Sequence, residues 1–414
     1  MSKIIFHADL DQFFVAVEVR NNPSLKGKAV AIGGGPNGRG IITTASYEAR
    51  RYGLRAGMSA MDARRLCPHV IFIRGNTSAY IYISKNVKDI LQEYSDRVEM
   101  LSVDEACLDV TDTVWSYASV EELGYRIKRR IYESEGVTVS IGAGANRMVA
   151  KMASDLCKPN GFLYLPPAKV AAAYNHLPVG KLVGVGRATE PVLNGLGILT
   201  IGDLAAYPAD VLKAKFGVRG PELKTLAQGG GSDQVMTRDE LPDEKSVGHE
   251  MTFSDNLKTT VDIEGRLLML TEKVARRMRV GGFAGRVVTL KLRYKGMETH
   301  LHSHKFARPL WFEGDIFSAA RRLFYEIYDT ARPVRLIGVS VSGLSKTSRH
   351  LQQELFDRHA ELHTLANACD DIKDRYGEAV IGYASGLLTR SGRKSVRNPT
   401  DYNVIPFRFE GMSR

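Results

Sequence analysis

The chain of 414 residues carries a formal net charge of +11, and 44% of its residues are hydrophobic. This length predicts several domains, and a basic charge without a long basic run predicts a folded surface that binds a polyanion. Nucleic acid is favoured over membrane as the partner, because no apolar run approaches the roughly 20 residues that span a bilayer.

The residues near the N-terminus and the cysteines bear on the compartment. His7 and Asp9 interrupt the first apolar run too early for a signal peptide. The four cysteines are far apart and form no CxxC pair, which argues against disulfides and against a cysteine zinc site. We therefore expect a cytoplasmic protein.

Strand and helix patterns mix in the first part of the chain. Residues 3–9 predict a strand, 11–20 the start of a helix, and 28–32 and 41–44 two strands around a glycine-rich turn at 33–38. No Gly-Lys-Ser/Thr follows these glycines, so a hairpin loop is favoured over a phosphate-binding loop.

The alternation continues over the next hundred residues. Amphipathic helices are predicted at 78–95 and 119–134, with two short strands between them in 98–111. A strand at 137–141 and a helix at 147–156 follow. Such alternation indicates an α/β or α+β core.

Short helices with glycine punctuation are predicted from 166 to 230. Residues 182–204 resemble a helix-hairpin-helix unit, in which Gly184 and Gly186 let backbone amides approach DNA phosphates without reading sequence. An ordinary helical turn is the alternative. The polar stretch 228–244 then indicates an interdomain linker.

Residues 287–294 alternate cleanly between apolar and polar side chains. Lys291 and Arg293 share one face of this predicted strand, and the other face is apolar, as expected for a sheet that packs on helices and lies along a phosphate backbone. Residues 243–346 hold 18 lysine and arginine residues against 12 aspartate and glutamate residues, so more than half of the net charge lies here.

Three histidines, His300, His302 and His304, share one face of the next predicted strand. A metal site is the alternative to a DNA-facing strand that carries neutral histidines. The DNA-facing strand is favoured, because the sequence shows no acidic or cysteine partner beside the three histidines.

Acidic residues stand at the ends of two strand-like runs, Asp9 and Asp11 in the first, Asp104 and Glu105 in the second. Carboxylates there are costly to desolvate unless cations compensate them, and two divalent ions can serve phosphoryl chemistry. This requires neighbouring strand ends, and a turn or bulge that aims Asp104 and Glu105 together. Solvated turns are the alternative.

Four segments in the same order carry a family resemblance: DLDQFFVAVE at 9–18, TTASYEAR at 43–50, LSVDEA at 101–106, and AKMAS with KPNG within 150–161. Together they closely resemble the Y-family of translesion DNA polymerases, in its bacterial DNA polymerase IV branch. The likeness runs from Lys3 to about Leu344.

The resemblance implies an α+β multidomain fold, a right-hand polymerase with a ferredoxin-like palm, small fingers, a helical thumb with a helix-hairpin-helix unit, and a little finger of a β-sheet and two helices. It assigns the palm to 1–18 and 73–165, the fingers to 19–72, the thumb to 166–232, a linker to 233–242, the little finger to 243–346 and a tail to 347–414.

It also implies the chemistry, which is low-fidelity, damage-tolerant synthesis on primer-template DNA. Asp9, Asp104 and Glu105, with the Leu10 carbonyl, would hold two Mg²⁺ ions, and the primer 3′-hydroxyl would attack the α-phosphorus of a dNTP. Asp11 is expected to be a bystander.

Six residues match the nucleotide contacts of the family: Phe13, Phe14, Thr44, Tyr47, Arg50 and Lys158. Phe14 would collide with a 2′-hydroxyl and select deoxynucleotides, while Phe13 contributes a backbone amide and packs in the core. Ser46 departs from the asparagine common in relatives, a change expected to matter little.

The segment QQELF at 352–356 resembles a peptide that binds the sliding clamp, through Gln352, Leu355 and Phe356. Gln353 departs from the apolar residue common there, and a surface helix is the alternative. Residues 357–414 are expected to be partly disordered. We expect a monomer.

Two rival classes remain open from the residues. A nucleotidyl cyclase would use the same metals but would need neither a hairpin unit nor a basic sheet. A non-catalytic DNA-binding paralogue would have lost a carboxylate, and all three are present.

Overall fold

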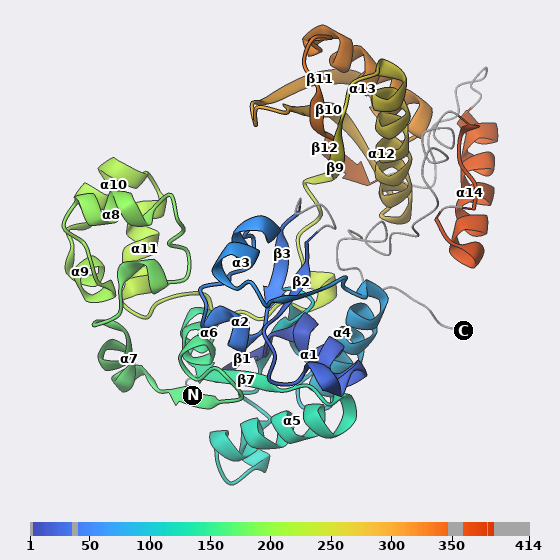
Figure 1. Ribbon diagram of the computed structural model, residues 1–414. Helices are drawn as coiled ribbons and strands as arrows, with labels where there is room; N and C mark the ends of the chain where they lie inside the picture. The colour runs from blue at the N-terminus through green and yellow to red at the C-terminus, as the bar shows by residue number, and fades with distance from the viewer. Residues whose placement is uncertain (1–2, 35–39, 347–358, 379, 385–414) are drawn as a thin grey trace. The chain divides into compact units, whose positions relative to one another are not determined.

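In the computed structural model of the chain (Figure 1), the described residues are 3–34, 40–346, 359–378 and 380–384. They divide into two compact units on either side of the Leu241–Pro242 bond. None of the helices in these ranges is long and apolar enough to cross a membrane.

A five-stranded sheet in the order β5-β6-β1-β7-β8 forms the centre of the first unit. Its strands are β1 (Ile5–Leu10), β5 (Val98–Met100), β6 (Glu105–Asp109), β7 (Val139–Gly144) and β8 (Phe162–Leu165). β1 pairs antiparallel with β6 on one side and β7 on the other, and only β7 and β8 are parallel among these pairs.

Helices bury β1 completely from both faces. Phe6, Ala8 and Leu10 join a core with α1 (Phe13–Asn21), α4 (Thr77–Gln92) and α5 (Val120–Glu135). Ile5 packs on the opposite face with Ala150 of α6 (Arg147–Leu156). Since side chains alternate along a strand, Asp9 belongs to the α6 face.

A small three-stranded sheet of order β3-β2-β4 lies between α1 and α4 in the chain. Its elements are η1 (Pro23–Leu25), β2 (Val30–Gly33), β3 (Ile42–Ala45), α2 (Tyr47–Arg50), α3 (Ala60–Leu66) and β4 (Ile71–Ile73). β2 and β3 are antiparallel, as a hairpin requires, although residues 35–39 of its loop lie outside the described ranges. The parallel partner β4 was not predicted.

A cluster of short helices follows β8 in the same unit. Its elements are α7 (Pro167–Tyr174), η3 (Val179–Lys181), α8 (Glu190–Gly195), α9 (Ile201–Ala206), α10 (Ala209–Phe216) and α11 (Arg219–Ala227). A separate short turn, η2 (Val114–Ser116), lies earlier in the chain, before α5. The buried Tyr174 hydroxyl donates to the Val149 carbonyl at 3.1 Å, which ties α7 to α6.

The stretch predicted to be a linker has specific contacts with the central sheet. Val235 is buried, and its carbonyl accepts from Arg97 Nη2 at 2.9 Å. Glu99 Oε2 accepts from the Met236 backbone at 2.9 Å. The segment before η4 (Arg238–Glu240) is therefore held against the sheet by these contacts, unlike a flexible linker.

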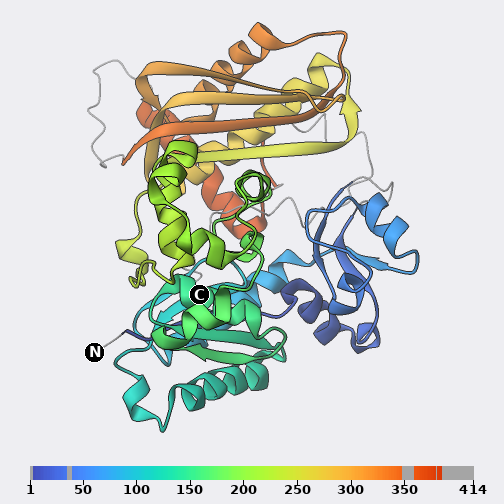
Figure 2. The same cartoon turned by 90° about the vertical axis from the view of Figure 1, so that its left-hand side faces the viewer.

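The second unit is built on a sheet of four long strands in the order β11-β10-β12-β9, which Figure 2 shows side by side. Its elements are β9 (Ser246–Leu257), α12 (Thr260–Val280), β10 (Phe283–Tyr294), β11 (Thr299–Leu310), α13 (Glu313–Ile327) and β12 (Val334–Lys346). The apolar face of β10 packs on both helices, and this confirms the predicted alternation.

Helix α14 (His359–Tyr376) is an ordered part of the tail, which was expected to be partly disordered. Ala366 is buried with Trp311 and Ala284, and Asp370 accepts from Arg279 at 2.7 and 3.0 Å. This helix was not predicted, because it is polar over most of its surface and its docking depends on partners about 90 residues away in the chain.

Candidate active site

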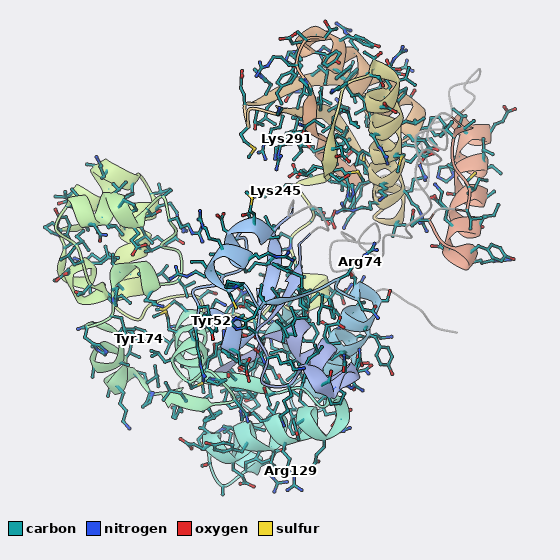
Figure 3. The ribbon with its side chains drawn as sticks, viewed as in Figure 1. Tyr52, Arg74, Arg129, Tyr174, Lys245 and Lys291 are labelled. Atoms are coloured by element: carbon teal, nitrogen blue, oxygen red, sulfur yellow. The ribbon has the colours of Figure 1, made fainter. Side chains whose placement is uncertain are left out.

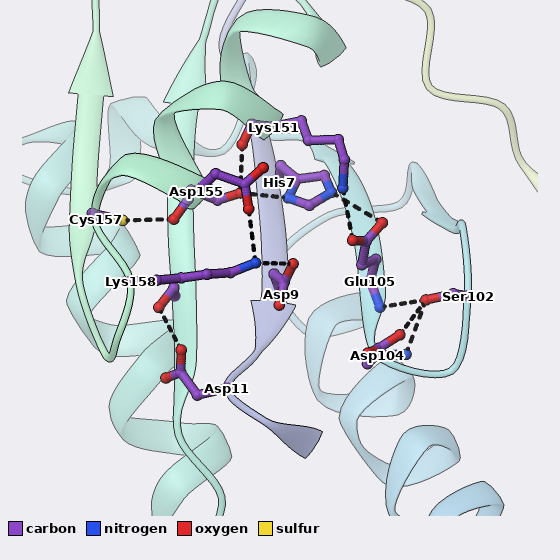
Figure 4. A network of polar contacts seen from close by, with 12 residues as sticks. His7, Asp9, Asp11, Ser102, Asp104, Glu105, Lys151, Asp155, Cys157 and Lys158 are labelled. Carbon is purple, nitrogen blue, oxygen red and sulfur yellow. Dashed lines mark hydrogen bonds and ion pairs between the residues drawn. The ribbon is translucent and has the colours of Figure 1, made fainter. Parts of the chain in front are cut away.

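Antiparallel pairing of β1 with β6 brings the two acidic strand ends together. Asp9 lies directly opposite Glu105 in the register, and the Leu10 amide donates to the Asp104 carbonyl at 2.9 Å. The required turn is present, because residues 102–104 form a bend in which the Ser102 hydroxyl accepts from the Asp104 and Glu105 amides (Figure 4).

Asp9 is 7% exposed, and an ammonium group compensates its charge. Lys158 Nζ lies 2.6 Å from Asp9 Oδ2 and 2.8 Å from Asp155 Oδ1 (Figure 4). Burial raises the pKa of Asp9 to about 7. Although burial opposes its charge, the Asp9 carboxylate raises the pKa of Lys158 above its ordinary value.

Glu105 has a different environment. His7 Nε2 lies 3.7 Å from its carboxylate, and Lys151 Nζ donates to it at 2.6 Å. The contact with His7, followed by the ion pair with Lys151, holds the pKa of Glu105 well below its usual range. His7 is fully buried, and its Nδ1 lies 2.8 Å from the Ser154 hydroxyl.

The sequence analysis missed Lys151 and His7. Lys151 and Asp155 are four positions apart within helix α6, so helical periodicity alone could have placed them on one face, and Lys158 follows two residues after the helix ends. His7 and Asp9 are two positions apart in β1, so their side chains point to the same face of the sheet, and this was a second signal available in the sequence.

Three carboxylates at one sheet edge provide the hard oxygen ligands that divalent cations prefer. Each already has a partner, Lys158 for Asp9, Lys151 for Glu105 and the Ser102 hydroxyl for Asp104. Within the described ranges, no three His, Cys, Asp or Glu side chains are grouped as a metal site in this arrangement. The donor chemistry fits such ions, provided that the carboxylates exchange these partners for them.

Asp11, which was expected to be a bystander to the metal site, has hydrogen bonds of its own. It is 2% exposed and accepts three hydrogen bonds, from Tyr47, Ser140 and the backbone of Asn160. None of these partners is a ligand assigned to the metals. The sequence concealed this role because Ser140 and Asn160 are more than 120 residues away.

Tyr47 and Arg50 lie one turn apart on α2, with the Arg50 guanidinium 5.0 Å from the centre of the Tyr47 ring. Thr44 is half-buried in β3 just before them. Ser46 is buried and caps α2, because its hydroxyl accepts from the Ala49 amide at 3.1 Å. The departure at Ser46 is therefore compatible with the local fold.

The two phenylalanines of α1 have different environments. Phe13 is buried in the main core, as expected. Phe14 is half-buried and stacks on Tyr80, with ring centres 4.3 Å apart and an interplanar angle of 13°. Tyr80, whose hydroxyl donates to Glu18 at 2.6 Å, was not predicted.

The glycines predicted to contact DNA lie between η3 and α8. Gly184 has a φ of +96°, a conformation that favours glycine, and a Cβ at Gly186 would have open space around it. Both glycines are exposed, so solvent reaches the backbone at these positions.

Lys291 and Arg293 lie on the face of the second sheet that the helices leave open (Figure 3 labels Lys291). Lys291 is paired with Glu250 at 2.7 Å, and Arg293 donates to Thr299 at 2.7 Å.

The histidines of β11 correct an expectation. His300 and His302 lie opposite Leu292 and Leu290 in the register, so they share the helix-facing side and not the open side. His302 lies 2.6 Å from Glu326 of α13, so an acidic partner also exists. A DNA-facing role for these histidines was wrong, because directly paired residues of antiparallel strands point to the same face. The clamp residues Gln352, Leu355 and Phe356 lie outside the described ranges.

Comparison with known proteins now defines the class. Residues 8–155 match the model of the impB/mucB/samB family, and residues 244–355 match the model of the C-terminal domain of that family. A DNA polymerase IV of Desulfatibacillum aliphaticivorans is 37% identical over 398 residues, which cover 95% of this chain and 99% of that protein. A DNA polymerase IV of Lactococcus lactis subsp. cremoris (strain MG1363) is 41% identical over 347 residues, covering 83% and 94%.

Solved structures agree. A Y-family DNA polymerase chimera of Dbh and Dpo4 has a TM-score of 0.70 and 28% identity, covering 82% of this chain and 98% of that one. An insertion ternary complex of Dbh DNA polymerase has a TM-score of 0.57, 27% identity and the same coverage.

The chain belongs to the impB/mucB/samB family of Y-family translesion DNA polymerases. It is a DNA-directed DNA polymerase, and its family depends on divalent metal. The predicted family and α+β fold class are confirmed, and the cyclase and non-catalytic alternatives are set aside.

Proposed function

We propose that the acidic edge of the central sheet is the nucleotidyl-transfer centre, and that it holds two Mg²⁺ ions. Asp9, Asp104 and Glu105 would bind them with the Leu10 carbonyl. The observation that carries this proposal is the β1–β6 register, which places Asp9 opposite Glu105 beside Asp104. Bound there, the ions would neutralise charge on the reacting phosphate and its leaving oxygen.

Residues of the chain itself would bind and orient the incoming dNTP. Tyr47 offers a hydroxyl, Arg50 a planar fork and Lys158 a point charge for the triphosphate oxygens. Thr44 and the backbone near Phe13 would assist. The proximity of Lys158 to Asp9 supports this assignment, because the γ- and β-phosphates must lie beside the metal ligands.

Phe14 would exclude ribonucleotides. Its ring stacks on Tyr80, which limits how far it can move when a 2′-hydroxyl approaches. A ring held in this way would discriminate between the two sugars by steric collision.

The partners proposed are primer-template DNA and a dNTP. The likeness to an insertion ternary complex of Dbh supports both. In this assignment the palm is 1–18 and 73–165, the fingers 19–72, the thumb 166–232, the linker 233–242 and the little finger 243–346. Amides near Gly184 and Gly186 and the side chains of Lys291 and Arg293 would contact DNA phosphates.

The remaining parts of the proposal rest on the sequence. Residues 352–356 within the tail 347–414 would bind a sliding clamp through Gln352, Leu355 and Phe356. The protein would act as a monomer in the cytoplasm, where its DNA substrate is.

Primer extension tests the proposal. Wild-type protein should extend a primed template with dNTPs and Mg²⁺, while Asp104→Ala should lose extension by at least about a hundredfold and keep its affinity for DNA, because the metals act mainly on transition-state charge. Asp112→Ala, at an exposed acidic residue beyond the opposite end of β6, is the matched control and should extend normally. Normal extension by Asp104→Ala would refute the metal assignment.

A further inference from the structure

Asp11 joins two segments that belong to different modules of the first unit. Its Oδ1 accepts from the Tyr47 hydroxyl at 3.2 Å and from the Ser140 hydroxyl at 2.7 Å. Its Oδ2 accepts from the Asn160 amide at 2.9 Å. Tyr47 lies on α2 beside the small sheet, whereas Asn160 lies in the turn that carries Lys158.

A buried lysine holds the same turn from its other side. Lys128 Nζ donates to the Val139 carbonyl at 2.7 Å, to Asn160 Oδ1 at 2.7 Å and to the Gly161 carbonyl at 3.1 Å. The Asp11 carboxylate and the Lys128 ammonium therefore fix the turn together, and their opposite charges favour each other.

Tyr47 is held at a second point by the residue next to Asp11. Gln12 Oε1 accepts from the Tyr47 backbone amide at 2.7 Å, and Gln12 has a φ of +41° at the start of α1. Two consecutive residues thus hold Tyr47 by its backbone and by its hydroxyl. Burial and then the charge of Asp11 raise the pKa of the Tyr47 hydroxyl, so it stays a proton donor.

The charge of Asp11 is unfavourable by itself in this place. A carboxylate that is 2% exposed costs desolvation energy, and it repels a triphosphate bound nearby. It can still favour the reaction if it orders donors that would otherwise adopt several arrangements, since groups ordered in advance lose less entropy on binding.

We propose that Asp11 is a positioning residue for the dNTP triphosphate. It holds Tyr47 and the Lys158 turn in one arrangement, and it touches neither the metals nor the reacting atoms. This inference rests on the proposed roles of Tyr47 and Lys158 in binding the triphosphate.

Steady-state primer extension on the full chain tests it. Asp11→Ala should raise the KM for dNTP by about tenfold or more, change kcat much less, and leave the affinity for primer-template DNA unchanged. Tyr47→Phe and Lys158→Ala should each raise the same KM. When both are combined, adding Asp11→Ala should raise the KM by less than about threefold, because the groups that Asp11 positions are gone.

Asp11→Asn is the control for the possibility that Asp11→Ala acts only through misfolding. The amide has the same shape, its oxygen can accept from the Asn160 amide, and its NH₂ can donate to the two hydroxyls. It should therefore keep the KM within about threefold of the wild type. Ser95→Ala controls for lost stability, because Ser95 donates to the Asp109 carbonyl at 2.6 Å at the far end of β6. It should lower the melting temperature without raising the KM.

The outcomes separate the two hypotheses. If Tyr47→Phe and Lys158→Ala leave the KM unchanged, the proposed triphosphate contacts fail and the inference falls with them. If Tyr47→Phe and Lys158→Ala raise the KM but Asp11→Ala does not, only the inference is overturned. The same holds if Asp11→Ala raises the KM as much in the Tyr47→Phe/Lys158→Ala protein as it does in the wild type. An Asp11→Asn protein as impaired as Asp11→Ala would also overturn it, because charge and not positioning would then matter.

Discussion

Lys158 Nζ lies 2.6 Å from Asp9 Oδ2, so a residue proposed to bind the triphosphate is paired with a residue proposed to bind metal. Both side chains are largely buried. The pair limits the cost of burying two charges, and binding of metal and nucleotide would separate it. The site is therefore stabilised before its ligands arrive, by its own cations.

The raised pKa of Asp9 predicts that this carboxylate destabilises the metal-free protein at neutral and basic pH. A group whose pKa is higher in the folded state stabilises it at low pH, and that contribution disappears as the pH rises through about 7. Asp9→Asn removes this titrating group and also a partner of Lys158, so the thermal stability of the variant should fall less than that of the wild type between pH 5 and pH 8. Thermal unfolding in EDTA at both pH values measures this difference, and a difference independent of pH would contradict the prediction.

Mg²⁺ should stabilise the wild type in the absence of DNA. A ligand that binds only the folded state adds about 2.7 kcal/mol at a hundred times its dissociation constant. The increase in melting temperature should be large at pH 8, smaller at pH 5 where protons compete for Asp9, and lost in Asp104→Ala. A NaCl series at matched ionic strength is the control, and equal shifts with both salts would mean that no specific metal site exists.

Phe14→Ala should raise incorporation of ribonucleotides relative to deoxynucleotides by at least about tenfold, because the collision with the 2′-hydroxyl is removed. Single-nucleotide insertion with matched dNTP and rNTP gives the ratio of kcat/KM values. Phe13→Leu is the control, since Phe13 is buried in the core and should affect stability but not sugar choice. An unchanged ratio in Phe14→Ala would remove it as the selecting residue.

Asp370→Asn should loosen α14 from α12. Asp370 pairs with Arg279, whose side chain is 9% exposed and also pairs with Glu313, and removing one partner of a buried pair costs about 3 kcal/mol or more. Limited proteolysis should cut within α14 faster than in the wild type, while basal primer extension stays unchanged. Asp371→Asn, at the exposed neighbour, should be cut at the wild-type rate. Equal cutting rates in all three proteins would mean that the ion pair does not hold the helix.

Deletion of residues 352–356 should reduce clamp-stimulated synthesis and leave basal synthesis intact. Replacing Leu355 and Phe356 together by alanine should have the same effect, because apolar anchors carry most of the binding energy of short peptides. Primer extension with and without clamp separates the two activities. An equal loss of clamp-stimulated and basal synthesis would argue against a clamp-binding peptide.

Local patterns in the sequence determined much of the architecture. Helix 147–156 and the alternation of β10 follow from side-chain periodicity, which is a property of neighbouring residues. The acidic strand ends could be predicted because burying carboxylates is costly wherever the strands lie. Order and spacing of the four motifs carried the family resemblance without any knowledge of contacts.

Tertiary structure alone decided which partners these groups have. Asp11 meets Asn160 across 149 positions, and Glu105 meets Lys151 across 46. The helix-facing side of His302 depends on the register of β10 with β11, and the docking of α14 depends on Arg279. Periodicity identifies the face on which a side chain lies, but only the folded chain determines what lies opposite that face.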